Sequence, residues 1–192
     1  CGTLRCAVTI AAFVAVSLTG CSPEDPFIPT RNNVVPEKNG AYLRVIHAAA
    51  DGPDVRVWVD STVLFNGAIQ KYMYFATGVN DAKYYPVDSA AATVSFVDAS
   101  GRTVATTPVS FRRNGYYTVY LHGRGSDLDA LVTTDTVDAP DRNDPLPAKI
   151  RLVNLVPDAP SISLHFGSPT ATPLLSGVVY QSASPYARLA AI

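Results

Sequence analysis

An internal repeat constrains the fold of this chain more than any other feature. Residues Leu43–Asp60, LRVIHAAADGPDVRVWVD, align without a gap with Ile150–Gly167, IRLVNLVPDAPSISLHFG. Self-similarity of this kind indicates a tandem of one structural unit. We therefore expect two copies of a β module, with the second copy cut short. The aligned pairs include Arg44 with Arg151, Asp51 with Asp158, Pro53 with Pro160, and Val55, Val57 and Val59 with Ile162, Leu164 and Phe166.

Apolar and polar residues alternate along the first copy, which is typical of strands with one buried face. The alternation begins at Leu43–His47 and resumes at Val55–Val59, after the turn at Asp51-Gly52-Pro53. Asn114-Gly115 is the strongest short signal for a hairpin turn. No segment shows sustained helical periodicity, so we expect an all-β, immunoglobulin-like antiparallel β-sandwich of about seven strands. The other expected strands are Val63–Phe65, Lys83–Val87, Thr93–Asp98, Thr103–Phe111, Tyr116–His122 and Leu128–Thr134.

The first forty residues carry targeting signals. Arg5 precedes the uncharged apolar run Cys6–Leu18, which suits a signal peptide and is too short to span a membrane. The run ends in Leu18-Thr19-Gly20-Cys21, which resembles a bacterial lipobox. We expect residues 1–20 to be cleaved and Cys21 to carry the lipid. An ordinary secretory signal with an incidental Cys21 is the alternative.

A lipid at Cys21 would hold the chain on a membrane. By resemblance to Gram-negative lipoproteins, Ser22 after this cysteine favours the outer membrane. Residues 21–40 are rich in proline and are expected to form an extended tether. The further predicted boundaries are 41–136 for the first β-sandwich module, 137–148 for an Asp/Pro linker, and 149–192 for the N-terminal half of the second module. Because the chain begins with Cys and stops inside the second copy, we expect a fragment of a longer open reading frame.

Charge and cysteine content exclude several classes of function. The formal net charge is −1, with 15 Lys and Arg against 16 Asp and Glu. No global basic field is therefore present to attract nucleic acid. All three cysteines, Cys1, Cys6 and Cys21, precede the first expected strand. The β modules thus have no disulfide, no Cys-ligated zinc and no Cys nucleophile.

The sequence contains no recognisable catalytic motif, so we expect neither an enzyme nor a cofactor. It lacks a Gly-x-Ser-x-Gly elbow and a Ser-x-x-Lys motif, and Gly123-Arg124-Gly125-Ser126 predicts a turn rather than a phosphate loop. His47 ends the first strand where the second copy has Asn154, which indicates a shared turn-capping role. His122 is expected on the solvent face of its strand.

The linker is acidic and offers only weak candidates for metal binding. Carboxylate oxygens suit Ca²⁺, and clustered Asp at a module junction is faintly similar to cadherin interdomain linkers. An exposed, solvated linker has the same composition, and no Asp-x-Asp-x-Asp-Gly loop is present. We therefore predict no metal site, with Asp135, Asp138, Asp141 and Asp144 as the weak candidates.

Aromatic residues are the best candidates for ligand binding. Tyr84 follows Gly67 by 17 positions, whereas Tyr186 follows Gly177 by 9, so the first copy carries an insertion near 71–82. Loops on a rigid scaffold often carry function, and Tyr is enriched at recognition surfaces. The alternative is an extra edge strand with inward aromatics, and half-buried edge packing for the tryptophan. The candidate ligand-binding residues are Trp58, Tyr72, Tyr74 and Phe75.

Several short motifs follow one another along the first copy. They are Arg-Val-x-His in the opening strand, the Asp-x-Pro turn, the Val-x-Val-x-Val strand, Gly67, Tyr85-Pro-Val and Gly115-Tyr-Tyr-Thr-Val. In this order they resemble the bacterial domain-of-unknown-function family 4397, over one full module and half of another. The resemblance implies a β-sandwich, frequent tandem copies and an envelope location. It implies no activity and therefore no catalytic residues.

These observations favour a lipid-anchored cell-envelope protein of tandem β-sandwich modules, with a non-enzymatic binding or structural role and an unknown ligand. Besides the membrane, a glycan or another envelope protein is the expected partner. Two alternatives stay open. One is a carbohydrate-binding surface module that uses Trp58 and the loop Tyr72–Phe75. The other is an accessory part of an enzyme whose catalytic region lies outside this sequence.

Overall fold

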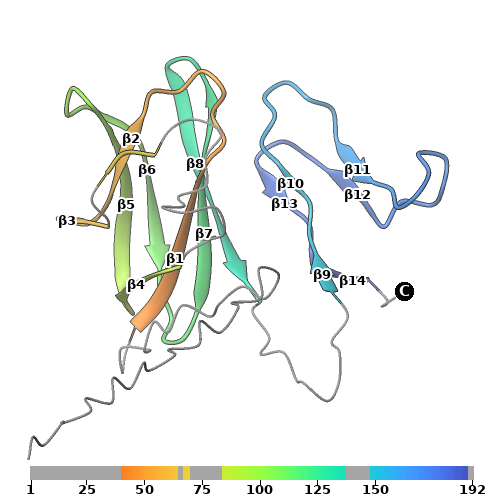
Figure 1. Cartoon of the computed structure of the whole chain (residues 1–192), viewed down its shortest axis with the longest axis horizontal. Coiled ribbons are helices and arrows are strands. Elements are labelled where there is room, and N and C mark those ends of the chain that lie inside the picture. The colour runs from red at the N-terminus through yellow and green to blue at the C-terminus, as the bar shows by residue number, and fades with distance from the viewer. Residues whose placement is uncertain (1–39, 65–66, 70–83, 137–147, 190–192) are drawn as a thin grey trace, which may run out of the picture. The chain divides into compact units, whose positions relative to one another are not determined.

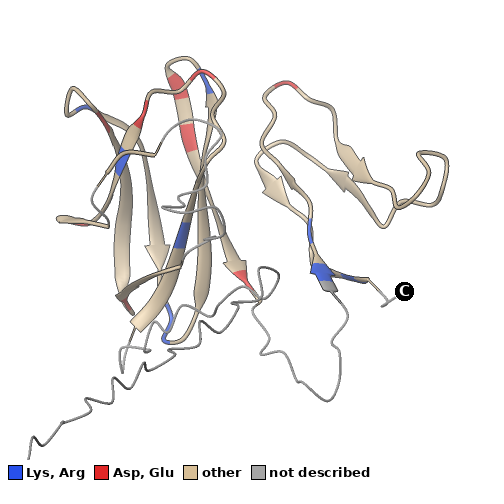
Figure 2. Ribbon diagram, in the orientation of Figure 1, with Lys and Arg blue, Asp and Glu red and all other residues tan. Residues whose placement is uncertain are grey.

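The computed structural model describes residues 40–64, 67–69, 84–136 and 148–189, and all regular structure within them is β-strand. The part of the chain so described contains no helix that is long and apolar enough to cross a membrane. Figure 2 shows Lys and Arg interspersed with Asp and Glu over the described part of the first copy, without an extended region of one sign there.

The first copy is a sandwich of two four-stranded sheets, which confirms the predicted all-β sandwich fold. Figure 1 shows the two sheets lying face to face. One sheet has the order β4-β1-β7-β8 and the other the order β3-β2-β5-β6. Their strands are β1 Gly40–His47, β2 Val55–Val59, β3 Thr62–Val63, β4 Tyr85–Asp88, β5 Ala91–Asp98, β6 Thr103–Ser110, β7 Tyr116–Arg124 and β8 Asp127–Asp135.

Strand β1 lies between two neighbours of opposite direction. It pairs antiparallel with β4, where Leu43 lies opposite Tyr85. It pairs parallel with β7, where Val45 lies opposite Val119. The sequence predicted antiparallel strands throughout, so this parallel pair is a departure from the expectation. Strand alternation reports which face is buried, and it carries no information about the direction of a neighbour.

The core lies between the two sheets and is built from alternate residues of each strand. On β1 and β7 these are odd-numbered positions such as Leu43 and Val119, and on β5 they are even-numbered positions such as Phe96. Each is almost completely buried. The other main core residues are Val45, Val55, Val57, Ile69, Val94, Ala105, Val109, Phe111, Tyr117 and Leu121.

The Asn114-Gly115 step is not a hairpin turn, so that prediction is wrong. Strand β6 belongs to one sheet and β7 to the other, and the connection crosses between them. Asn114 does adopt the positive φ of 58° that the dipeptide favours. Its backbone N–H, however, donates to the carbonyl of Gly40, so the turn is fixed against the start of β1 rather than closing a hairpin.

The second copy repeats the first half of the sandwich as three two-stranded pairs. Strand β9 (Ala148–Ile150) pairs with β14 (Ala187–Leu189) as β1 pairs with β4. Strand β10 (Val153–Asn154) pairs with β13 (Ser182–Ala183), and β11 (Ile162–Leu164) pairs with β12 (Leu175–Val178). The aligned sequence positions therefore form corresponding strands in both copies.

Candidate functional site

The outer face of the β4-β1-β7-β8 sheet carries a network of polar side chains around Asp135. This residue ends β8, and its carboxylate is only 2% exposed. The register of β7 and β8 places Thr133 opposite Thr118, and both side chains are buried. A buried carboxylate is stable only where hydrogen bonds and opposite charge compensate for lost hydration, so its partners define the site.

One carboxylate oxygen of Asp135 is bonded by residues of the first copy. The hydroxyl of Tyr84 donates to Oδ2 at 2.7 Å, and that of Thr118 donates at 2.5 Å. The guanidinium of Arg44 lies 3.5 Å from the same oxygen and donates through Nε to Thr118 at 3.0 Å. Arg44 also lies over the ring of Tyr84, 4.9 Å from its centroid.

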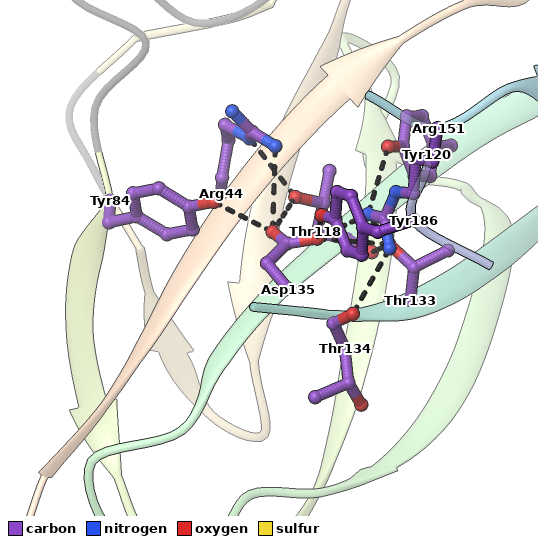
Figure 3. A network of polar contacts seen from close by, with 9 residues as sticks. All are labelled: Arg44, Tyr84, Thr118, Tyr120, Thr133, Thr134, Asp135, Arg151 and Tyr186. Carbon is purple, nitrogen blue, oxygen red and sulfur yellow. Dashed lines mark hydrogen bonds and ion pairs between the residues drawn. The ribbon is translucent and has the colours of Figure 1, made fainter. Parts of the chain in front are cut away.

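The other carboxylate oxygen is bonded mainly by residues of the second copy. Arg151 donates to Oδ1 of Asp135, and the hydroxyl of Tyr186 lies 3.4 Å from it. Arg151 also donates to Thr133 Oγ1 at 2.5 Å and to the Thr134 carbonyl at 3.0 Å. Its guanidinium lies 4.8 Å from the ring centroid of Tyr186. Figure 3 shows the two arginines reaching the carboxylate from different elements.

The two halves of the network are made by equivalent residues. Arg44 and Arg151 are aligned in the repeat. Tyr84 and Tyr186 immediately precede the residues paired with Leu43 and Ile150 respectively. Each copy thus supplies one arginine stacked on one tyrosine, and Asp135 is the acceptor for both pairs. We call this set of five residues the Asp135 clasp.

Burial and neighbouring charges shift the pKa of three groups of the clasp, Tyr84, Tyr186 and Arg151. Burial raises the pKa of Tyr84 well above its ordinary value, and its hydrogen bond to Asp135 adds to this effect. Burial and the Asp135 charge likewise raise the pKa of Tyr186. Burial opposes the charge of Arg151, but attraction to Asp135, Tyr120 and Tyr186 outweighs it and raises the pKa. Both tyrosines therefore stay protonated and Arg151 stays charged near neutral pH, so the clasp is suited to holding segments together.

His122 is buried, and the prediction that it lies on a solvent face is wrong. It is 1% exposed, and its Nδ1 lies 3.3 Å from the hydroxyl of Tyr180 in the second copy. The two rings meet edge to face with centroids 5.6 Å apart. Burial lowers the pKa of His122, and the charge of Asp129 opposes this only in part.

His47 and Asn154 perform the same task in the two copies, as the alignment predicted. His47 Nε2 lies 2.9 Å from the carbonyl of Pro53, and Asn154 Nδ2 lies 3.5 Å from that of Pro160. Both side chains are fully buried. The polar residue at the strand end therefore holds the Asp-x-Pro turn, whose prolines are aligned in the repeat.

The structure describes only some of the residues singled out by the sequence. Trp58 is half-buried on β2, opposite Val63 and Ser95. Its indole Nε1 is buried and has no hydrogen-bond partner within the described residues. Among those residues, no group of three or more His, Cys, Asp or Glu lies close enough to hold a metal ion. Cys21, Tyr72, Tyr74, Phe75, Asp138, Asp141 and Asp144 lie outside the described residues.

Sequence reasoning missed the Asp135 clasp, although one signal was present. In β7, Tyr116 to His122 is apolar, aromatic or hydroxyl-bearing at both odd and even positions, and all but Tyr116 are buried. A strand without a charged face indicates burial on both sides. That reading would have directed attention to Thr118 and to the residues opposite it on β8. Asp135 was considered only as a weak metal ligand in the linker.

A protein-family model matches the part of the chain that carries most of the site described above. Residues 41–165 match the model for a domain of unknown function, DUF4397. The chain belongs to this family. The DUF4397 match covers all but the first residue of the first sandwich and extends into the second copy. It includes Arg44, Tyr84, Thr118, Asp135 and Arg151. No curated protein matches the chain.

Proposed function

We propose that this chain is a non-enzymatic structural and binding component of the bacterial cell envelope. In this proposal it is anchored by lipid at Cys21, periplasmic or surface-exposed, and acts by displaying β-sandwich copies joined through the Asp135 clasp. The observation that carries the proposal is the saturation of a buried carboxylate by arginine–tyrosine pairs from two copies. A group engaged in this way stabilises an arrangement of segments and has no free lone pair for proton transfer.

Lipid anchoring is tested in a Gram-negative host fed radiolabelled palmitate. The wild-type chain is expected to take up label and to fractionate with the outer membrane. Cys21→Ser should abolish both, whereas Cys6→Ser, inside the apolar run, should leave both unchanged. Labelling that persists in Cys21→Ser would show that the anchor lies elsewhere or is absent.

The non-enzymatic role is tested by screening the purified chain against hydrolase, transferase and oxidoreductase substrates. No turnover above background is expected. Turnover that disappears on changing one polar residue, with the thermal midpoint unchanged, would replace this proposal by the enzyme alternative.

A carbohydrate-binding role is a second candidate, favoured by Trp58. Its ring is half-buried, and its Nε1 donor lacks a partner within the described residues. Indole rings stack on sugars, so the exposed part of this ring offers a stacking surface, while the buried Nε1 lies out of a surface ligand's reach. A glycan array that gives binding lost in both Trp58→Ala and Tyr74→Ala supports this role. Binding that is absent, or unchanged by both variants, removes it.

A further inference from the structure

A shallow groove lies on the β3-β2-β5-β6 sheet, which does not carry the Asp135 clasp. Its volume is about 400 Å³, and it covers the first residues of β5 and the last residues of β6. The register of these strands places Ala91 opposite Ser110 and Thr93 opposite Pro108. All four side chains are exposed, and Asp60, which follows β2, lies beside them. The groove has the size of a small-molecule site.

Asp60 carries the single charge among the described residues that line the groove. Its Oδ1 accepts the backbone N–H of Thr93 at 2.8 Å, which holds the carboxylate in place. Its Oδ2 has no partner within the described residues and can accept from a ligand. The hydroxyls of Thr93 and Ser110 can both donate and accept. The groove is therefore suited to a ligand that is rich in hydroxyl groups and carries no negative charge.

Trp58 belongs to the next row of residues on the same face. Thr93 and Ser95 are two positions apart on β5, so their side chains point to one face, about 7 Å apart along the strand. Ser95 lies opposite Trp58, and its hydroxyl is 3.5 Å from that of Thr106 on β6. The outer face thus continues from a half-buried aromatic ring, over hydroxyl side chains, into the groove.

The position of this surface within the sheet favours a glycan over a peptide. A peptide that adds as a strand needs an unpaired edge, whereas β5 is paired on both sides, with β2 and β6. A sugar ring instead presents an apolar C–H face to an aromatic ring and hydroxyl groups at its rim. Trp58 offers the first kind of contact, and Asp60, Thr93 and Ser110 offer the second.

We infer that this face binds a linear neutral glycan across two adjacent subsites. One sugar ring stacks on the exposed part of Trp58, and a neighbouring ring lies in the groove with its hydroxyls on Asp60, Thr93 and Ser110. The inference rests on the carbohydrate-binding candidate described above and adds a second subsite and a ligand class to it. The charge of Asp60 repels glycans that carry carboxylate or sulfate groups.

The test uses the fluorescence of Trp58, the single tryptophan of the chain. The purified full chain is titrated with β-1,4-linked gluco-, manno- and xylo-hexasaccharides, and with hexagalacturonate and a heparin hexasaccharide as acidic probes. A saturable change is expected with at least one neutral hexasaccharide and with neither acidic probe. The matching monosaccharide should bind at least about tenfold more weakly, because it cannot occupy both subsites.

Two variants test the groove separately from the ring. Asp60→Asn keeps an acceptor for the Thr93 N–H and tolerates the φ of 52° at this position. It should bind about fivefold more weakly, because charged hydrogen bonds contribute more than neutral ones. Thr93→Val should weaken binding several-fold. Asp54→Asn and Thr103→Val, at exposed positions outside the groove, are the matched controls and should bind like wild type.

The outcomes distinguish this inference from the function on which it rests. Calorimetry measures Trp58→Ala, which lacks the fluorophore, and thermal unfolding shows that each variant is folded. Binding that Trp58→Ala abolishes, but that Asp60→Asn and Thr93→Val leave unchanged, would overturn the groove and keep the carbohydrate-binding candidate. Preference for an acidic probe, or equal binding of the monosaccharide, would also overturn the inference. No binding of these probes or of any neutral glycan on the array would remove both.

Discussion

Asp135 is the single acceptor shared by the arginine–tyrosine pairs of both copies. Its two oxygens serve two equivalent arginine–tyrosine pairs, so a single carboxylate compensates two cations. Arg151 is the more buried of these, with 9% of its side chain exposed against 25% for Arg44. Removing the negative charge would leave both cations without their counter-charge.

We therefore expect Asp135→Asn to lower the free energy of unfolding by about 3 kcal/mol, at the lower end for breaking a buried ion pair, because Arg44 keeps some contact with water. Urea denaturation measures this change. Asp127→Asn, at an exposed position of the same strand, is the matched control and should differ from wild type by less than about 0.5 kcal/mol. Equal stability of both variants would contradict the role of the clasp.

His122 predicts a pH dependence of stability. Burial lowers its pKa in the folded chain below the ordinary 6.5, so the unfolded chain binds the proton more readily. The stabilisation is fully present above about pH 6.5 and is lost as the pH falls below that value. The unfolding free energy should therefore fall more steeply from pH 7 to pH 5 in wild type than in His122→Gln. Parallel curves for the two proteins would show that His122 makes no such contribution.

At the scale of elements, the turn between β7 and β8 depends on one glycine. Gly123 has φ +113°, and a Cβ there would lie 2.1 Å from the Asp127 carbonyl oxygen. Arg124 and Asp127 are the last pair of the ladder, so Gly125 and Ser126 form the tip. The predicted turn in this segment is confirmed. Its geometry shows that Gly123 is the position where a larger residue does not fit.

Gly123→Ala should destabilise the chain by roughly 1–3 kcal/mol from backbone strain, and further because of the clash with Asp127. Gly125→Ala is the matched control: φ is +59° and nothing lies within 4 Å of the added carbon, so about 1 kcal/mol is expected. Thermal or urea unfolding of the two variants measures the difference. If Gly125→Ala proved the more harmful change, the crowding at Gly123 would not be the cause.

The sequence predicted the strands well, but it did not predict which strands pair with one another. Period-two alternation depends on residues within one strand, so β2, β5 and β6 were found near their true bounds. The β1–β7 pairing and the sheet change at Asn114 depend on residues far apart in the chain, which local patterns do not report. The clasp was missed for the same reason, because Arg44 and Asp135 are 91 residues apart. The repeat was the exception, since it correctly predicted corresponding strands and the shared role of His47 and Asn154.

At the scale of the whole molecule, two ion pairs between described residues join the copies, and they differ in burial. Arg151 meets Asp135 with both side chains largely buried. Arg124 lies 4.0 Å from Asp158, and both side chains are exposed. Exposed pairs contribute little because water and salt screen them, whereas a buried charged hydrogen bond contributes more. The coupling between copies should therefore depend on Arg151.

Arg151→Met is expected to destabilise the second copy by about 2 kcal/mol, the loss of a charged hydrogen-bond set. Arg124→Met should change it by less than about 1 kcal/mol. Amide hydrogen exchange of residues 149–189, compared with exchange of β5 and β6, localises the effect. Equal exchange in the two variants, or a loss of protection confined to the first copy, would contradict the assignment of Arg151 as the main link.

The parallel pairing of β1 with β7 also determines the order in which the sandwich can close. When β1 leaves the ribosome or the translocon, its β7 partner is still many residues from being delivered, and β4 is the first neighbour that can pair with it. Contacts of such long sequence separation make folding slow. In the growing chain, β1 therefore has only one of its two partners available until β7 has been delivered.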